Sequence, residues 1–309
     1  MQSMEELIDH AAEGFCSYAG VGTQAGKRHE QDAKVSSDSH LLASPFLHTH
    51  LDENAVVHPT AVVDASASLG RSVRVGPYSV VGPNVVLEDG VELKSHVVVE
   101  GRTRIGRETV VHPFACLGGE PQDKKHNPHV APHSSSLFQL EIGRQCVIRE
   151  HVTIHGSTSY SAAMPTSLGD NCWILCGAHV GHDVQIGSHV VLSNNVCVAG
   201  HVEIGSFAII GGLVGLKQHI KIGSLAMVGG GSAVDGDVLP YGLASGNRAK
   251  LLGLNLIGLR RAKISRHQIK LMLRVVRYLF GSSLTNIAAV CPKTGFAPAL
   301  EYACMVHIH

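Results

Sequence analysis

The chain has few aromatic and few charged residues: of its 309 residues, 5% are Phe, Trp or Tyr and 16% are Asp, Glu, Lys or Arg. This composition argues against the aromatic core and the charge-rich surface of an ordinary helical enzyme. Lys plus Arg balance Asp plus Glu at 25 each, which argues against attraction of the whole chain to nucleic acid or to a membrane surface.

Long apolar runs and clustered cysteines are also missing. No run approaches the roughly 20 apolar residues that a membrane-spanning helix requires. The start of the chain carries Glu5, Glu6 and Asp9, where a secretory or mitochondrial signal would be basic. The eight Cys residues include no CxxC pair and lack the density of a disulfide-rich secreted domain. We therefore expect a soluble intracellular protein with free thiols, no membrane span and no nucleic-acid partner.

The sequence does contain a long repeat with a period of six residues. An aliphatic residue returns every six positions in eleven hexads from Val57 to Gln122, in three hexads from Ile142, and in twelve hexads from Leu168 to Leu239. Insertions at 123–141 and 160–167 interrupt the repeat. A period of six fits neither a helix nor a simple strand, but it is typical of a triangular solenoid with three hexads in each coil.

The repeat predicts which positions face the interior of such a solenoid. The first residue of each hexad is expected to point inward, together with the Val, Ala or Cys at the fifth position, so Cys146 and Cys172 would be small core residues. The small residue at the second position, such as Gly70 or Gly106, is expected to permit the corner. We therefore predict a mainly β fold, a parallel β-helix over residues 55–239.

The pattern changes on both sides of the β-helix. Residues 1–54 show no period and are expected to form a poorly ordered N-terminal extension. Pro240 marks the end of the repeat, and residues 240–309 are expected to form a helical cap and tail. Ser265 and Gln268 form a capping box that predicts a helix over 266–280, and a second helix is expected over roughly 255–263.

The expected cap is strongly basic. From Val238 to Leu300 there are ten Lys or Arg residues and no Asp or Glu. A solvated helix face normally mixes charges of both signs, so this run favours an acidic partner or a phosphate ligand.

Stacking of the coils brings polar residues together. His182, Gly200 and Gln218 are spaced by one coil and would form a column, and Asp183, His201 and His219 would form the column beside it. His179 would lie one corner before His182. A His, an exposed backbone N–H and an amide offer a general base, an oxyanion donor and a substrate-orienting group. These groups together favour acyl transfer.

Three further features, the PQDKK insertion, the spacing from AHVGHD to AGH and the GLNLIGLRR segment, resemble the UDP-N-acetylglucosamine O-acyltransferases that begin lipid A biosynthesis. The resemblance covers roughly residues 57–280. It implies a left-handed β-helix, a homotrimer with sites between neighbouring subunits, and no cofactor or metal. The implied reaction moves an R-3-hydroxyacyl group from acyl carrier protein to the 3-hydroxyl of UDP-N-acetylglucosamine. The enzyme would be cytoplasmic, or organellar in a plant or alga, and its basic cap would dock the acidic carrier protein.

The resemblance also implies roles for individual residues. His182 would be the general base, Asp183 would hold its ring in the needed tautomer, and Gly200 would supply the oxyanion N–H. Met227 and Gly230 would form the acyl-chain ruler. The residues expected to bind substrate are Asp123, Lys125, His179, His201, Gln218, Asn255 and Arg261.

Zinc binding is an alternative for the same cluster, because His179, His182, His201 and Cys176 are also potential zinc ligands. The hexapeptide-repeat carbonic anhydrases hold zinc with His residues that are usually spaced more widely than His179 and His182. This spacing disfavours zinc.

Two alternative functions remain. Lys217, Ile257 and Ala262 stand where the family usually has His, Glu and Arg, and these departures motivate a non-catalytic hexapeptide-repeat scaffold. The second alternative is the N-acyltransferase of the same pathway, which shares the β-helix and a catalytic His. That enzyme carries a separate N-terminal nucleotide-binding domain, for which residues 1–54 are too few.

Overall fold

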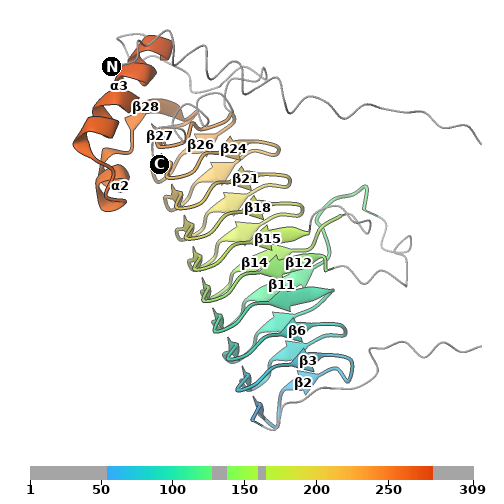
Figure 1. Cartoon of the computed structure of the whole chain (residues 1–309). Helices are drawn as coiled ribbons and strands as arrows, with labels where there is room; N and C mark the ends of the chain where they lie inside the picture. Colours follow the sequence, from blue (N-terminus) through green and yellow to red (C-terminus); the bar gives the residue numbers. More distant parts are fainter. Residues whose placement is uncertain (1–53, 127–137, 159–164, 281–309) are drawn as a thin grey trace, which may run out of the picture.

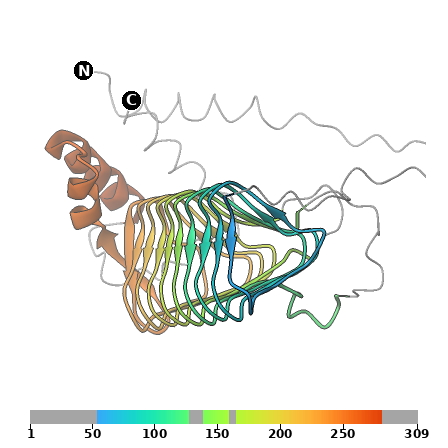
Figure 2. The same ribbon diagram turned by 90° about the horizontal axis from the view of Figure 1, so that it is seen from below.

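A computed structural model of the chain describes residues 54–126, 138–158 and 165–280 (Figure 1). The expected N-terminal extension, most of both insertions and the tail after residue 280 lie outside these residues. The described coils stack into a long prism that is triangular when seen along its axis (Figure 2). Helices lie at its C-terminal end (Figure 1).

Short strands build three sheets along the sides of the prism. Sheet 1 contains, in spatial order, β1 (Val56–Val57), β4 (Arg74–Val75), β7 (Glu92–Leu93), β10 (Val110–Val111), β13 (Val147–Ile148), β16 (Trp173–Ile174), β19 (Val191–Leu192), β22 (Ile209–Ile210), β25 (Met227–Val228), β27 (Gly242–Ser245) and β28 (Lys250–Leu254). Sheet 2 contains β2 (Val62–Val63), β5 (Val80–Val81), β8 (Val98–Val99), β11 (Cys116–Gly119), β14 (Thr153–His155), β17 (His179–Val180), β20 (Cys197–Val198), β23 (Gly215–Leu216) and β26 (Ala233–Val234). Sheet 3 contains β3 (Ser68–Leu69), β6 (Val86–Leu87), β9 (Thr103–Ile105), β12 (Leu140–Ile142), β15 (Thr166–Leu168), β18 (Gln185–Ile186), β21 (Glu203–Ile204) and β24 (Lys221–Ile222).

The strand register confirms the predicted coil. Val57 pairs with Val75, and Val180 pairs with Val198, so residues 18 positions apart are neighbours in parallel strands. Within the described residues, each of the 26 predicted hexads contributes one strand, from β1 to β26. Each side of the prism is therefore one hexad long, as the period indicates.

The interior of the prism is filled as the repeat predicts. Leu69 and Val73, the first and fifth residues of one hexad, are 2% and 0% exposed. Cys146 and Cys172 are fully buried and belong to the same apolar core. Burial of this continuous aliphatic column supplies the main stabilisation of a fold whose individual strands are only two to five residues long.

The predicted role of the second-position glycines was wrong. The corner is formed by the fourth residue, which adopts a left-handed conformation at Ser72 (φ 56°) and Phe114 (φ 65°), whereas Gly70 has no positive φ. A Cβ on Gly70 would lie 2.7 Å from the backbone nitrogen of Asp89 in the next coil. Glycine is therefore required there for close stacking of the coils and not for the turn.

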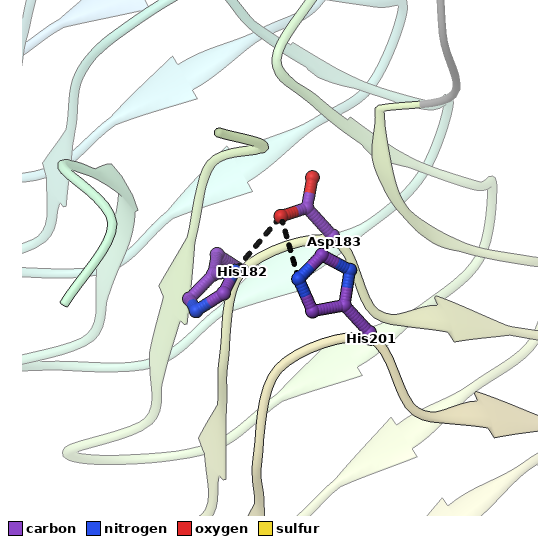
Figure 3. Close-up of side chains that lie close together, drawn as sticks. All are labelled: His182, Asp183 and His201. Atoms are coloured by element: carbon purple, nitrogen blue, oxygen red, sulfur yellow. Dashed lines mark hydrogen bonds and ion pairs between the residues drawn. The ribbon is translucent and has the colours of Figure 1, made fainter. Parts of the chain in front are cut away.

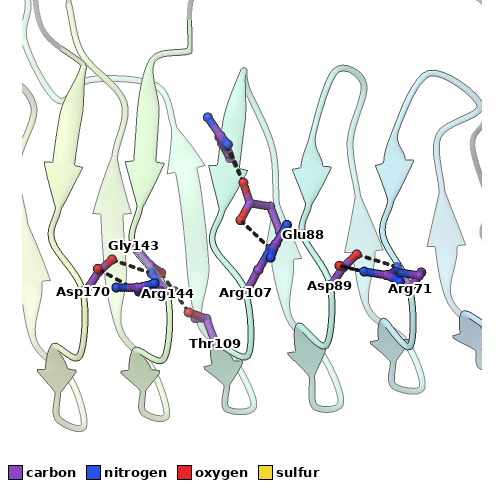
Figure 4. A network of polar contacts seen from close by, with 9 residues as sticks. Arg71, Glu88, Asp89, Arg107, Thr109, Gly143, Arg144 and Asp170 are labelled. Atoms are coloured by element: carbon purple, nitrogen blue, oxygen red, sulfur yellow. Dashed lines mark hydrogen bonds and ion pairs between the residues drawn. The ribbon is translucent and has the colours of Figure 1, made fainter.

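Polar side chains tie neighbouring coils together at one corner (Figure 4). Arg71 donates to Asp89 at 2.9 Å, and Arg144 donates to Asp170 at 3.0 Å. In both pairs the carboxylate also accepts the backbone N–H of the arginine. These exposed pairs contribute little net stability because solvent screens their charges, so they fix the stacking register more than they stabilise the fold.

The cap differs from the wholly helical prediction in its first part. After Pro240 the chain forms β27, which pairs in parallel with β25 and extends sheet 1, and then β28, which returns antiparallel. The helix α2 (Leu256–Arg261) follows, and it is shorter than the predicted 255–263. The hairpin was not predicted because, of its two strands, only β27 pairs with a strand of the repeat.

The second cap helix, α3, matches its prediction. It spans Arg266–Phe280, and Ser265 and Gln268 exchange the expected capping hydrogen bonds. Its buried Ile269, Met272 and Val276 pack in the small core of the cap. None of the described helices has both the length and the apolar composition needed to cross a membrane.

Candidate active site

A cleft of about 550 Å³ follows the outer side of sheet 2. It is long because the side chains that point outward from successive strands of one sheet lie in a row. Its lining residues are Gln122, His155, His179, Gly181, His182, Cys197, Val198, Ala199, Gly200, Gly215, Leu216, Lys217, Gln218, Ala233, Val234, Asp235, Asn247 and Arg248.

His182 and Asp183 form a close pair at the corner between sheets 2 and 3 (Figure 3). The His182 Nδ1 atom lies 2.8 Å from an Asp183 carboxylate oxygen. The His182 ring is buried, with 6% of its surface exposed, yet it lines the cleft. With Nδ1 bound to the carboxylate, the other ring nitrogen, Nε2, is the one that can accept a proton from a substrate.

Asp183 is held in place by residues that the sequence did not indicate. Its carboxylate accepts hydrogen bonds from the Ser157 hydroxyl and from the Thr158 hydroxyl and backbone N–H. Burial raises the pKa of Asp183, but the hydrogen bonds from Ser157, His182 and Thr158 outweigh burial and lower the pKa below its ordinary value. Asp183 is therefore ionised near pH 7 and oriented toward His182.

Gly200 lies one coil beyond His182, as the stacking prediction required. A Cβ on Gly200 would lie 2.6 Å from Cε1 of His182, so the imidazole ring lies directly against this glycine. Within the described residues the Gly200 N–H has no hydrogen-bond partner, while its carbonyl accepts from the His219 N–H. The cleft thus contains a backbone donor beside the His182 ring that no described residue occupies.

The neighbouring histidines also form the predicted column. The His201 ring meets the His182 ring edge-on at 5.1 Å and stacks on the His219 ring at 4.5 Å. Burial lowers the pKa of His201, against the opposing effect of the Asp183 charge. His201 Nε2 lies 3.7 Å from Asp183 (Figure 3).

His179 lies on β17, on the same side of the coil as His182 and not one corner earlier as predicted, and it lines the cleft. Its Nδ1 is 2.8 Å from the Thr153 hydroxyl, and its ring packs edge-on against His155. Burial lowers the pKa of His179, and His155 adds to this effect. A neutral His179 therefore offers a hydrogen-bonding group and not a fixed charge.

Of the predicted substrate-binding residues Gln218, Asp123 and Lys125, only Gln218 lines the cleft. Gln218 lines the cleft, but Asp123 and Lys125 do not, although their neighbour Gln122 does. Asp123 accepts a hydrogen bond from the Lys125 backbone N–H in the turn that follows β11. The chain just before the insertion therefore lies at one end of the cleft, next to His155.

Asn255 and Arg261 lie in the cap, outside the cleft of the single chain. Asn255 is the N-cap of α2: its amide oxygen accepts from Gly258 N–H, and its amide nitrogen donates to the Leu225 carbonyl. The side chain of Arg261 is exposed at the end of α2. The structure brings neither residue near His182.

The two expected ruler residues also lie apart from His182. Met227 points outward from β25 in sheet 1, and Gly230 lies at the corner that leads to β26 in sheet 2. Neither lines the cleft of the single chain.

One group of side chains has the composition of a metal site. Ligand atoms of His182, Asp183 and His201 all lie within 4.8 Å of one another. The Asp183 carboxylate, however, already accepts hydrogen bonds from Ser157, Thr158 and His182. Because these hydrogen bonds already occupy the carboxylate oxygens, the arrangement suits an Asp–His pair better than a metal ligand. Cys176 does not belong to the cluster.

Comparison with known proteins shows the family to which the chain is related. Residues 237–294 match a family model described as domain 2 of UDP N-acetylglucosamine O-acyltransferase, and residues 66–101 and 165–200 match the bacterial transferase hexapeptide model. The acyl-[acyl-carrier-protein]–UDP-N-acetylglucosamine O-acyltransferase of Caulobacter vibrioides is 53% identical over 229 residues, which cover 74% of this chain and 84% of that protein. The corresponding protein of Agrobacterium fabrum is 43% identical over 240 residues, with coverages of 77% and 86%.

A solved structure agrees with these matches. The UDP-N-acetylglucosamine O-acyltransferase of Moraxella catarrhalis superposes with a TM-score of 0.69 at 36% identity, covering 81% of this chain and 90% of that one. The solved structures of this family are left-handed parallel β-helices, which confirms the predicted fold. The chain belongs to the UDP-N-acetylglucosamine O-acyltransferase family.

Proposed function

We propose that this protein transfers an R-3-hydroxyacyl group from acyl carrier protein to the 3-hydroxyl of UDP-N-acetylglucosamine, the first step of lipid A biosynthesis. The observation that carries the proposal is the His182–Asp183 pair, with its 2.8 Å contact, beside a free backbone N–H at Gly200. A base held by a carboxylate and an adjacent oxyanion donor are the groups that acyl transfer to an alcohol requires.

The geometry supports a direct transfer. His182 takes the proton of the sugar hydroxyl through Nε2 while the oxygen attacks the thioester carbonyl, and the new oxyanion accepts a hydrogen bond from the Gly200 N–H. When the tetrahedral intermediate collapses, the C–S bond breaks and His182 returns the proton to the thiolate. Asp183 stays ionised and stabilises the imidazolium that forms between these two steps.

We assign the substrate contacts from the residues that line the cleft and from the roles that the family resemblance implies. His179 and Gln218, which line the cleft, hold the sugar and the acyl group. Asp123, Lys125, His201, Asn255 and Arg261 complete the binding site, and Met227 with Gly230 limits the acyl chain. Several of these residues lie outside the cleft of one chain, so the complete site requires a neighbouring copy.

The outer surface of the prism supports a homotrimer. The outward residues of sheet 3 are largely polar and charged, including Arg104, Glu203 and Lys221. Those of sheets 1 and 2 include the exposed apolar side chains Trp173 and Val80, which are 53% and 40% exposed. Two apolar sides on each prism fit two neighbours around a threefold axis.

The basic cap is assigned to the carrier protein. Arg266, Lys270 and Arg274 are exposed on α3 at intervals of four residues, so they lie along one face of the helix. The described part of the cap contains no acidic residue from Val238 onward. This face offers an acidic carrier protein a long-range electrostatic attraction.

The test is a turnover assay with labelled UDP-N-acetylglucosamine and a series of R-3-hydroxyacyl carrier proteins, with His182→Ala as the variant. We expect wild-type turnover and a loss of at least about 10²-fold in the variant, with the oligomeric mass unchanged. Turnover that survives in His182→Ala would remove the proposed base. Binding of the nucleotide without turnover by the wild-type protein would support the non-catalytic scaffold instead.

Two additional activity measurements test the N-acyltransferase reaction and a metal-dependent reaction. The N-acyltransferase reaction predicts turnover with a 3-O-acylated glucosamine nucleotide and none with UDP-N-acetylglucosamine. A metal-dependent reaction predicts loss of activity after chelator treatment and recovery with zinc. We expect neither result.

A further inference from the structure

Lys217 is a cation of the cleft that forms no ion pair with any residue that the structure describes. Its side chain is exposed and lines the cleft with His182 and Gly200. Within the described residues no carboxylate lies within ion-pair distance of Lys217. The second cation of the cleft, Arg248, is bound to Asp235 at 2.9 Å.

The strand register explains why Lys217 has no ion-pair partner in the described part of the chain. Leu216 pairs with Val234, so the next residues along the two coils, Lys217 and Asp235, are neighbours at the same corner. Asp235 would be the natural partner of Lys217, but Arg248 from the loop after β27 occupies its carboxylate. The arrangement leaves one positive charge in the cleft that is available to a bound anion.

The same register places Lys217 close to the reaction centre. Val198 pairs with Leu216, so Lys217 lies one coil beyond Ala199, and Gln218 lies one coil beyond Gly200. Neighbouring coils are about 4.8 Å apart, and the four-carbon stem of a lysine is long enough to cover this separation. The ammonium group can therefore reach the space in front of the Gly200 N–H.

We propose that Lys217 is a second oxyanion donor, which shares the negative charge of the tetrahedral intermediate with the Gly200 N–H. This inference rests on the acyl-transfer function proposed above. As the sugar oxygen forms its bond to the thioester carbon, the carbonyl electron pair moves to the oxygen, and Lys217 and Gly200 both donate to it. When the carbonyl re-forms and the C–S bond breaks, both hydrogen bonds weaken, and Lys217 keeps its proton throughout.

A single backbone donor leaves much of an oxyanion's charge unbalanced, whereas an ammonium group in a cleft compensates it strongly. The competing ligand for Lys217 is the diphosphate of the nucleotide. A diphosphate is present with equal charge in the ground state and in the transition state, so a diphosphate contact would affect KM and not kcat. The two roles therefore have different kinetic signatures.

The experiment compares Lys217→Met, Lys217→Gln and Lys217→Arg with wild type, measuring kcat and the KM for UDP-N-acetylglucosamine at saturating acyl carrier protein. Removing an oxyanion donor is expected to lower kcat by about 10²–10³-fold. The KM for UDP-N-acetylglucosamine should stay within about threefold of the wild-type value, because the contact is made mainly in the transition state. Lys217→Arg should recover part of the lost kcat, because it restores the charge.

Lys221→Met is the matched control, because Lys221 lies on sheet 3, away from the cleft, and pairs with Glu203 at 3.0 Å. A kcat within about threefold of wild type in both Lys217→Met and Lys217→Gln would overturn the inference, and so would a raised KM with kcat retained. If Lys217→Met does not assemble, the Gln and Arg variants decide the result. Absence of wild-type turnover would instead overturn the proposed function, and the inference with it.

Discussion

The ring of His182 lies so close to Gly200 that a Cβ on the glycine would be 2.6 Å from Cε1 and 2.7 Å from Nε2 of the imidazole. These two residues are 18 positions apart and belong to neighbouring coils. The proposed base and the proposed oxyanion donor are therefore in contact, and each fixes the position of the other.

Gly200→Ala should inactivate the enzyme without unfolding it. The added methyl group must displace the His182 ring, because a Cβ carbon cannot lie 2.6 Å from a ring carbon to which it is not bonded. A misplaced base costs on the order of 10²-fold in rate. The measurement is kcat together with thermal unfolding. Gly82→Ala is the control, since its Cβ would meet its nearest atom at 3.4 Å, far from the cleft. Equal activity in both variants would contradict the contact.

Asp183→Asn should lower kcat by on the order of 10²–10⁴-fold while leaving the KM values nearly unchanged. The amide cannot stabilise the imidazolium, and it favours the wrong ring tautomer. Steady-state kinetics across a range of pH would measure the effect. Asp89→Asn removes a carboxylate from a different corner, where it pairs with Arg71, and should leave kcat unaltered. A variant Asp183→Asn with wild-type kcat would show that the carboxylate has no catalytic role.

The stability of the protein in acid should depend on Asp183. Its pKa is lower in the folded protein than in the unfolded chain, so its ionised form stabilises the fold above the ordinary carboxylate pKa of about 3.9. This contribution is lost as the pH falls from there through the folded pKa. Chemical unfolding at several pH values should show a smaller acid destabilisation in Asp183→Asn than in wild type. Parallel curves for the two proteins would contradict the lowered pKa.

Thr109→Val should destabilise the β-helix. The fully buried Thr109 hydroxyl donates to the Gly143 carbonyl at 2.9 Å and accepts from the Cys146 N–H, which bridges two coils (Figure 4). Removing it leaves the buried Cys146 N–H and the part-buried Gly143 carbonyl unpaired, and the buried group alone costs about 1–3 kcal/mol. Thermal or urea unfolding gives the difference, and Thr109→Ser, which keeps the hydroxyl, is the control. If Val and Ser variants unfold alike, the hydroxyl does not bridge the coils.

Reversal of charge on α3 should weaken use of the carrier protein. Replacing Arg266, Lys270 and Arg274 with Glu is expected to raise the KM for acyl carrier protein by about tenfold or more, while the KM for UDP-N-acetylglucosamine stays constant. Added salt should raise the wild-type KM for the carrier in the same direction and have less effect on the variant. A KM for the carrier that does not respond to either change would exclude α3 as the docking face.

Much of the fold follows from the sequence alone. An aliphatic residue every six positions defines the sides of the prism, and the equal length of the hexads defines the coil, so the columns His182–Gly200–Gln218 and Asp183–His201–His219 could be counted without a structure. The capping box at Ser265 likewise fixed the start of α3, because its hydrogen bonds are local.

Counting failed where the chain leaves the repeat. Ser157 and Thr158 contact Asp183 across an insertion, so their spacing from it is not a multiple of the coil and gave no signal. The β27–β28 hairpin depends on pairing with β25 and not on its own sequence pattern. The corner glycines were misjudged because their contacts are with the next coil, as at Gly70.

The sequence by itself determined the prism, the stacking columns and the chemical groups of the site, because a strict period converts position in the chain into position in space. Only the tertiary structure decided how those groups interact. In the structure, His182 contacts Asp183, and hydroxyl groups donate to that carboxylate. Arg248 binds the Asp235 carboxylate, so among the described residues Lys217 has no ion-pair partner. These outcomes depend on side-chain directions and on competition between neighbours for hydrogen bonds and charge, which a one-dimensional period does not contain.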